Sequence, residues 1–286
     1  MGDVWTTAMG TWCHELADLM LPFDRIALSR ADLVFMGAGT PGFSYLVADP
    51  CPDSFSQVLK SDIAIAMPRY PMGAHLRLDF CSFRSGTATP RVVGANGALW
   101  LMRQANPRVS GVIRRGLSDA KALSLFLFPW LPIPPWAEFR IFIRQGQRVG
   151  VSQYHPNAVF AQIAQHEQAL IAAFDSFVDA ALPRLPQPDL ALDVLAEPLA
   201  NGGFRMRLVD LSVLGPRTDT LLFTWENGGD FDGSFRFLQG DTTVTPHALP
   251  QTHLPPEPPS PPVIAAPTAA TLPAKSPSPD DDVWRI

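Results

Sequence analysis

Apolar and polar residues alternate along residues 138–144 and again along residues 149–153, with Gln145 and Gly146 between the two runs. A period of two residues on both sides of a glycine-containing turn predicts a β-hairpin. After this hairpin the period changes, and apolar residues recur every three or four positions from Phe160 to Val178. This spacing predicts a helix that ends before Pro183.

A second alternating pair of segments, residues 190–195 and 204–210, follows the helix and carries one aspartate on each side. Asn201-Gly202 between the segments favours a two-residue type I′ turn. In that register Asp193 lies directly opposite Asp210 on one face of the hairpin. Like charges in this position repel each other. The pairing therefore predicts a hard cation between the carboxylates, such as magnesium carrying phosphate.

Two other interpretations of the aspartate pair remain open. Gly203 can join the loop, which shifts the register by one residue and turns the two side chains to opposite faces. Alternatively, the carboxylates can form a solvated or arginine-paired face without a metal.

Shorter apolar runs in the first part of the chain predict further strands at residues 32–36, 62–67 and 98–102. A short helix is expected at residues 55–59, before the second of these strands. The resulting order of strands, hairpin, long helix and hairpin is typical of an α+β fold with mainly antiparallel sheets.

Composition limits the class of protein. The 286 residues allow one two-lobed domain or two small ones, and a hydrophobic content of 47% supports a globular body. A net charge of −5 with 17% charged residues leaves no basic surface for nucleic acid. Three widely separated cysteines indicate neither a disulfide framework nor a zinc site, which favours a reducing, cytoplasmic setting.

The N-terminus lacks the pattern of a secretory signal, and the longest uncharged stretch, residues 122–137, is too short and too rich in proline to span a bilayer. We therefore expect a soluble protein that does not bind membranes.

Composition changes abruptly near Thr245. Residues 246–286 are rich in proline, alanine, serine and threonine, and such a segment cannot bury enough apolar surface to fold. We expect a folded body over residues 1–245 followed by a disordered tail over residues 246–286. The last residues, Asp280 to Ile286, join acidic side chains to bulky apolar ones, which fits either a solvated terminus or a short docking motif.

Several segments together make the chain similar to the cell division cycle protein 123 family. The strongest likeness lies, in chain order, at Trp130, Ala137–Ile143, Val151–Gln153, Leu192–Val194, Leu208–Asp210 and Thr218–Glu226. A weaker likeness extends upstream to Trp12, Leu21–Phe23, Met67–Arg69 and Leu101–Arg103. The resemblance implies a two-lobed ATP-grasp-like fold, with an N-lobe of about residues 1–125 and a C-lobe of about residues 126–245.

In that family ATP lies between the two lobes, with basic side chains on its phosphates and acidic side chains on magnesium. By motif position, Asp193 and Asp210 take the places of magnesium ligands, which agrees with the cross-strand argument. Arg69 and Arg103 stand where the family has phosphate-contacting lysines. Arginine keeps the positive charge and offers a planar fork to phosphate.

The resemblance assigns roles to four further residues. Residues 125–130 fall where the strand between the lobes frames the adenine, so Leu127 and Trp130 are expected on the adenine side. Arg140 is expected either to reach a ligand phosphate or to brace Glu138 within the sheet. Ser212 stands where the family has an asparagine after the second metal aspartate, and its hydroxyl can also ligate magnesium.

Three functions are compatible with these residues. Eukaryotic members of the family help to assemble translation initiation factor 2 with bound ATP and Mg²⁺, so the first is an assembly factor whose partner in a eukaryote is the gamma subunit of that factor. The second is an ATP-dependent ligase, which would need an acceptor pocket that the sequence does not display. The third is a degenerate interaction module that has lost nucleotide. Neither an activated nucleophile nor an acceptor site stands out, so we expect no catalytic residue and no turnover.

Overall fold

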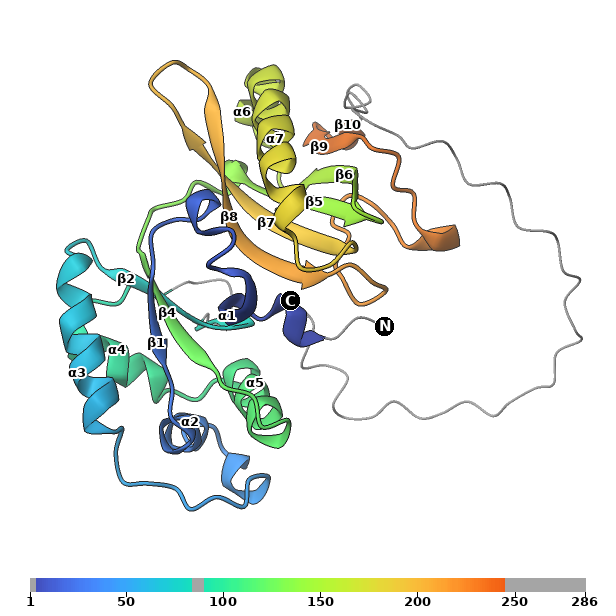
Figure 1. Ribbon diagram of the computed structural model, residues 1–286. Helices are drawn as coiled ribbons and strands as arrows, with labels where there is room; N and C mark the ends of the chain where they lie inside the picture. Colours follow the sequence, from blue (N-terminus) through green and yellow to red (C-terminus); the bar gives the residue numbers. More distant parts are fainter. Residues whose placement is uncertain (1–3, 84–89, 245–286) are drawn as a thin grey trace, which may run out of the picture.

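The structure is a computed structural model that describes residues 4–83 and 90–244. The predicted tail and its Asp280–Ile286 segment lie outside the described residues. The described chain contains two β-sheets, each with its own helices, and together they form two lobes with the short helix α1 (Met9–Trp12) between them (Figure 1). The predicted α+β class with mainly antiparallel sheets is confirmed.

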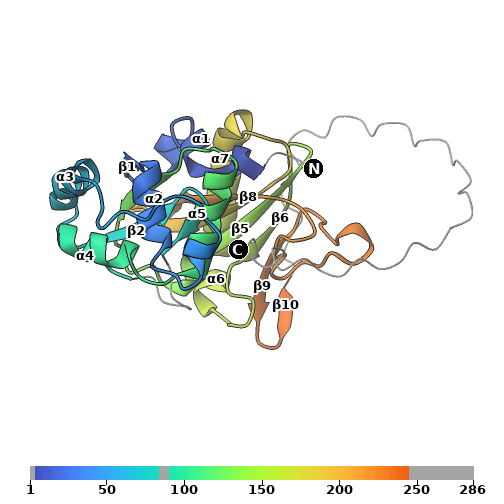
Figure 2. The same ribbon diagram turned by 90° about the horizontal axis from the view of Figure 1, so that it is seen from below.

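The first sheet has four strands in the order β1-β4-β2-β3, and all neighbours run antiparallel. Its strands are β1 (Asp24–Ala27), β2 (Ala74–Leu78), β3 (Cys81–Ser82) and β4 (Ser124–Pro129). The helices of this lobe are α2 (Arg30–Gly37), α3 (Gln57–Ala66), α4 (Gly94–Met102) and α5 (Pro107–Ser118). Helices α2 and α5 lie side by side in both views (Figure 2).

Three segments that were predicted as strands are helices in the structure. Residues 32–36 lie in α2, residues 62–67 lie in α3 and the short 3₁₀ turn Met67–Arg69, and residues 98–102 lie in α4. In α3 the buried residues Leu59, Ile63 and Ala66 follow a helical period, while Ile65 is 64% exposed. One face of this helix is therefore buried and the other is exposed. The apolar run is too short for its sequence to show the helical period. The helix expected at residues 55–59 corresponds to the start of α3.

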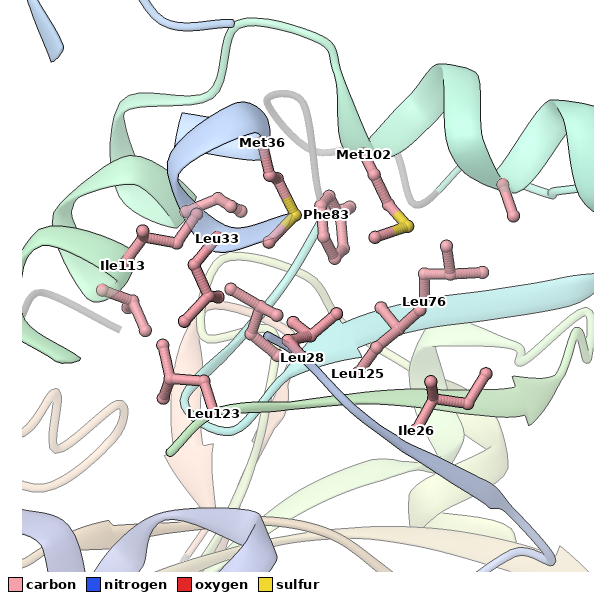
Figure 3. Packing of buried hydrophobic residues seen from close by; sticks show 14 of the residues in the cluster. Ile26, Leu28, Leu33, Met36, Leu76, Phe83, Met102, Ile113, Leu123 and Leu125 are labelled. Atoms are coloured by element: carbon pink, nitrogen blue, oxygen red, sulfur yellow. The ribbon is translucent and has the colours of Figure 1, made fainter. Parts of the chain in front are cut away.

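The first lobe closes around one apolar core. Side chains from α2, α4 and α5 meet residues of β1, β2 and β4 there. Figure 3 shows Leu33, Met36, Met102 and Ile113 on the helix side of this core and Ile26, Leu76 and Leu125 on the sheet side. Strand β4 alternates between two cores, because Leu125 and Leu127 belong to this one and Phe126 and Phe128 to that of the second lobe. This strand is thus the shared wall of the two lobes.

The second sheet has six strands in the order β10-β9-β6-β5-β7-β8, of which only β6 and β9 pair in parallel. Its strands are β5 (Glu138–Arg144), β6 (Gln147–Gln153), β7 (Leu190–Pro198), β8 (Phe204–Val213), β9 (Phe235–Gln239) and β10 (Thr242–Val244). The predicted hairpin of β5 and β6 is confirmed, with positive φ at both Gln145 and Gly146 as a type I′ turn requires. The predicted long helix is present as α6 (Ala161–Gln165) and α7 (Glu167–Ala181), which are interrupted at His166.

The N-terminal segment packs between the two lobes, because Trp5 and Ala8 are buried in the first core and the residues that follow reach the second. Met9, Trp12, Leu16 and Met20 are buried in the second core, and Met20 forms a parallel bridge with Leu208 of β8. This segment therefore ties the start of the chain to the strand that carries Asp210. None of the helices in the described ranges is long and apolar enough to cross a bilayer.

The hairpin of β7 and β8 differs from its prediction in one respect. Pro198 pairs with Phe204, so the loop contains the five residues from Leu199 to Gly203 and not the predicted two. Gly203 joins the loop by accepting a hydrogen bond from the amide of Leu199. The resulting shift is reversed further along, because a bulge at Val209 lies between the Val194–Leu208 and Asp193–Asp210 pairs. The predicted pairing of the two aspartates is therefore correct, although the predicted turn is wrong.

Candidate functional site

A cleft of about 660 Å³ lies between the two sheets. The first lobe contributes His75 and Arg77 of β2 and Arg108 of α5 to its walls, and the second lobe contributes Asp193 of β7 and Asp210 of β8. The segment from Phe128 to Pro135, which leads from β4 towards β5, closes one side. This volume is within the range of ordinary small-molecule sites.

One side of the cleft is apolar. It is formed by Phe128, Pro129, Trp130, Leu131 and Ile133, where the chain leaves the first sheet. The amide of Trp130 donates to the carbonyl of Gly73, and the guanidinium of Arg91 lies 5.3 Å from the centre of the Trp130 ring. These contacts fix an indole ring beside an open space, which suits the flat face of an aromatic ligand.

Asp193 forms a two-point ion pair with Arg140 of the neighbouring strand β5. The Nε atom of Arg140 lies 2.7 Å from Oδ1 of Asp193, and Nη2 lies 3.0 Å from Oδ2. Nη1 donates to the carbonyl of Asp219 at 2.8 Å. Burial by itself would lower the pKa of Arg140, but the Asp193 carboxylate outweighs it and the pKa is raised, so the guanidinium stays charged.

Asp210 is paired across the two lobes. Nη2 of Arg77, which comes from the first sheet, lies 2.7 Å from Oδ1 of Asp210, and Nη1 donates to the carbonyl of Val209 at 2.8 Å. The amide of Leu211 also donates to Oδ1. Burial raises the pKa of Asp210, the nearby Arg77 lowers it, and Asp193 raises it again, with a raised pKa as the result.

The cleft gathers only part of the site predicted from the sequence. Trp130, Asp193 and Asp210 line it, and Arg140 reaches it through its bond to Asp193. Ser212 pairs with Ala191, beyond the aspartate pair, and is not among the lining residues. Leu127 is fully buried in the first core, where its carbonyl accepts from the hydroxyl of Tyr70.

The two arginines that were expected to contact phosphate lie outside the cleft lining. Arg69 forms a two-point ion pair with Asp24, at 2.9 and 2.6 Å, and its side chain is 57% exposed. Arg103 follows α4 and stacks over the ring of Phe35 at 4.4 Å. Both side chains therefore have structural partners in the first lobe.

The structure adds residues that the sequence reasoning missed. Arg77 and Arg108 bring positive charge to the cleft, and Glu138 and His155 face each other there with 3.6 Å between Oε1 and Nε2. A signal for Arg77 was present in the sequence. It is a lone charge in the apolar run from Ala74 to Leu78, and a charge buried in a strand needs a partner.

The carboxylate pair can accommodate magnesium only together with an anionic ligand. No cluster of three histidine, cysteine, aspartate or glutamate side chains occurs within residues 4–83 and 90–244. Arg140 uses one lone pair on each oxygen of Asp193, so one remains on each, and Oδ2 of Asp210 has no hydrogen bond in this part of the chain. Asp193 and Asp210 would thus hold Mg²⁺ through carboxylate oxygens, with an anionic ligand and water supplying the remaining oxygen ligands.

Comparison with protein families and solved structures places these residues in a wider context. The D123 family model matches residues 114–251, which include β5 to β10 and both aspartates. A translation initiation factor eIF2 assembly protein of Xenopus laevis is 27% identical over 137 residues, which are 43% of this chain and 39% of that protein. A cell division cycle protein 123 of Eremothecium gossypii is 33% identical over 109 residues, which are 37% of this chain and 29% of that protein.

The match thus spans well under half the length of either of these curated relatives. Among solved structures, Cdc123 from Schizosaccharomyces pombe is similar with a TM-score of 0.60 and 19% identity, over 78% of this chain and 89% of that one. At that identity the likeness concerns the fold, and it extends over both lobes.

Proposed function

From the premise that this chain is a member of the D123 (Cdc123) family, we propose that it is an assembly factor for a protein complex and that it binds ATP with Mg²⁺ in the cleft between its two sheets. The observation that carries the proposal is the arrangement of the cleft. The carboxylates of Asp193 and Asp210 lie beside the guanidinium groups that pair with them, those of Arg140 and Arg77. An apolar wall that includes Trp130 forms another side of the cleft.

Each part of the cleft has a role in this proposal. The apolar wall from Phe128 to Ile133 holds the adenine, because stacking and burial favour a flat base there. Arg77 and Arg108 hold the phosphates through charge-assisted hydrogen bonds. Asp193 and Asp210 hold Mg²⁺ through their carboxylate oxygens. The ion would supply positive charge that neutralises part of the phosphate charge.

The proposed partner is translation initiation factor eIF2. Relatives from Xenopus laevis and Xenopus tropicalis are named as eIF2 assembly proteins, which supports the idea that this chain also acts by forming a protein complex. In a eukaryotic source we propose the gamma subunit as the direct partner. The signal of such a function is a stoichiometric complex and not steady turnover.

Nucleotide binding is tested by thermal unfolding of the full chain with ATP, with Mg²⁺ and with both. A ligand that binds only the native state raises the unfolding midpoint by mass action, so ATP with Mg²⁺ should raise it most. Asp210→Asn should lose the part that depends on Mg²⁺. Asp24→Asn is the control, because Asp24 pairs with Arg69 away from the cleft and its loss should leave the ligand-induced shift intact.

Partner binding is tested separately by size-exclusion chromatography with purified eIF2 subunits. A one-to-one complex with the gamma subunit supports the proposal, and separate elution of both proteins at micromolar concentration contradicts it. Release of ADP and phosphate that increases with an added amine or carboxylate would favour the ligase instead.

One observation favours a second function. Both aspartates already have arginine partners, so the pair is electrically balanced without any metal. An unchanged midpoint with millimolar ATP and Mg²⁺ would therefore favour an interaction module that has lost nucleotide.

A further inference from the structure

Arg77 connects the two lobes at the carboxylate pair. The side chain of Arg77 extends from β2 of the first sheet to β8 of the second. Its Nη1 donates to the carbonyl of the bulged residue Val209 at 2.8 Å, and its Nη2 lies 2.7 Å from Oδ1 of Asp210. Arg77 is only 4% exposed, so its charge acts in a poorly solvated place. Such a charge interacts strongly with any other ion that enters nearby.

The two arginines hold their carboxylates differently. Arg140 bonds both oxygens of Asp193 and also the Asp219 carbonyl, within the second lobe. Arg77 contacts a single oxygen of Asp210 from the opposite lobe, and its Nη2 lacks the alignment of a hydrogen bond there. The Arg77 contact is therefore the one that a ligand can replace at lower cost, because fewer well-formed bonds are lost.

A bare divalent cation meets an unfavourable site in this arrangement. Asp193 and Asp210 supply two negative charges, and Arg77 and Arg140 cancel both. A metal ion would have to displace a buried guanidinium or lie beside it, and like charges at that distance repel strongly. A phosphate group changes the balance, because it offers the guanidinium a second anionic partner.

We propose that Arg77 is a gate that makes cation binding by Asp193 and Asp210 depend on a phosphate-bearing ligand. The inference rests on the proposed nucleotide site and names the order of events in it. A phosphate draws the Arg77 guanidinium from Asp210, and the released carboxylate oxygen then accepts the metal. By linkage, phosphate raises the affinity for metal by the same factor as metal raises the affinity for phosphate.

The test is a titration of the full-length protein with Mn²⁺ alone, with free Mn²⁺ measured by electron paramagnetic resonance. Wild-type protein should bind Mn²⁺ weakly without nucleotide. Arg77→Met removes the charge and keeps an apolar stem, and it should bind Mn²⁺ alone at least about tenfold more tightly. Arg148→Met is the matched control, because Arg148 is mostly buried and pairs with Asp175 outside the cleft. It should behave as wild type.

A second variant at the same position keeps the test valid if Arg77→Met does not fold. Arg77→Gln also removes the charge but keeps an amide N–H donor for the Val209 carbonyl, and it should gain Mn²⁺ affinity as Arg77→Met does. Adding Asp210→Asn to either variant should abolish the gain. Equal Mn²⁺ affinity in wild type and in both folded Arg77 variants overturns the gate. If ATP does not stabilise the wild type while the Arg77 variants still bind Mn²⁺ more tightly than it does, the nucleotide proposal is wrong and the proposed role of Arg77 is supported.

Discussion

Asp193 lies directly opposite Asp210 because Val209 is bulged out of β8. Without the bulge, the five-residue loop of this hairpin would place Asp193 opposite Val209 and turn the two aspartates to different faces. The bulge also places the Val209 carbonyl where Arg77 can donate to it. One extra residue thus aligns the carboxylates with each other and joins the two lobes at the same point.

The buried pair of Arg140 and Asp193 should contribute far more to stability than an exposed pair of the same chemistry. Arg140→Met leaves the Asp193 carboxylate with no partner in a poorly solvated place, which typically costs about 3–5 kcal/mol. Arg69→Met removes an arginine from an exposed two-point pair with Asp24 and should cost at most about 1 kcal/mol. Urea unfolding of both variants measures the difference. Equal losses would mean that the Arg140 pair is as well solvated as the Arg69 pair.

Sequence patterns predicted the second lobe better than the first. The hairpin of β5 and β6, the helix after it and the strands β7 and β8 have long, clear periods, and all are present. In the first lobe the apolar runs are short, and a run of five or six residues does not separate a strand from one side of a helix. A local signal was available, because Ser29 and Ser56 each cap a helix by accepting from the amide three residues ahead.

The site was predicted in part for a related reason. Asp193 and Asp210 lie on neighbouring strands, so their approach follows from local pairing. Arg77 reaches Asp210 from a strand 133 positions earlier in the chain, and its contact depends on how the two lobes pack. Spacing within one sequence carries no information about such a contact. Arg69 and Arg103 were favoured as cations by family position, whereas the structure gives both of them partners within the first lobe.

The three cysteines should differ sharply in reactivity. Cys51 is exposed, whereas Cys13 and Cys81 are buried. Burial raises the pKa of Cys81 to about 11 and also raises the pKa of Cys13, so both stay protonated near neutral pH, and the thiol is a poor nucleophile. A thiol reagent at pH 8 should modify one group in the native protein and three after denaturation. Cys51→Ser should remove the native reaction, and rapid native modification of that variant would contradict the burial of the other two.

Glu197 should make the stability of the hairpin depend on pH in the acidic range. Partial burial alone raises the pKa of Glu197, but hydrogen bonds from Arg205 and Arg207 outweigh it and hold the pKa below its usual value of 4.5. A lowered pKa in the folded state stabilises the protein above the unfolded pKa, and this gain disappears as the pH falls through the folded pKa.

Wild type should therefore be more stable than Glu197→Gln above about pH 5, and the two should converge well below pH 4.5. Glu197 is 37% exposed, so solvent screening limits the difference to at most about 1 kcal/mol. Thermal unfolding from pH 3 to pH 7 provides the measurement. Glu226→Gln serves as the control, because Glu226 forms no ion pair within the described chain. A difference between wild type and Glu197→Gln that does not change with pH would show that the charge of Glu197 is not involved.

If nucleotide phosphates lie in the cleft, the arginines that line it should matter for ATP binding, and those elsewhere in the first lobe should not. Arg108 lines the cleft and has no ion pair within the described residues, so its guanidinium is available to an anionic ligand. A hydrogen bond to a charged group is typically worth about 1.5–3 kcal/mol, so Arg108→Met should weaken ATP binding in the presence of Mg²⁺ by about 10- to 100-fold.

Arg69→Met and Arg103→Met should bind ATP as wild type does, even where they unfold at a lower temperature. Calorimetric titration at fixed ionic strength separates these effects, because it reports affinity independently of the midpoint. Loss of affinity in Arg69→Met or Arg103→Met with full affinity in Arg108→Met would place the phosphates at the positions expected from family resemblance and away from the cleft.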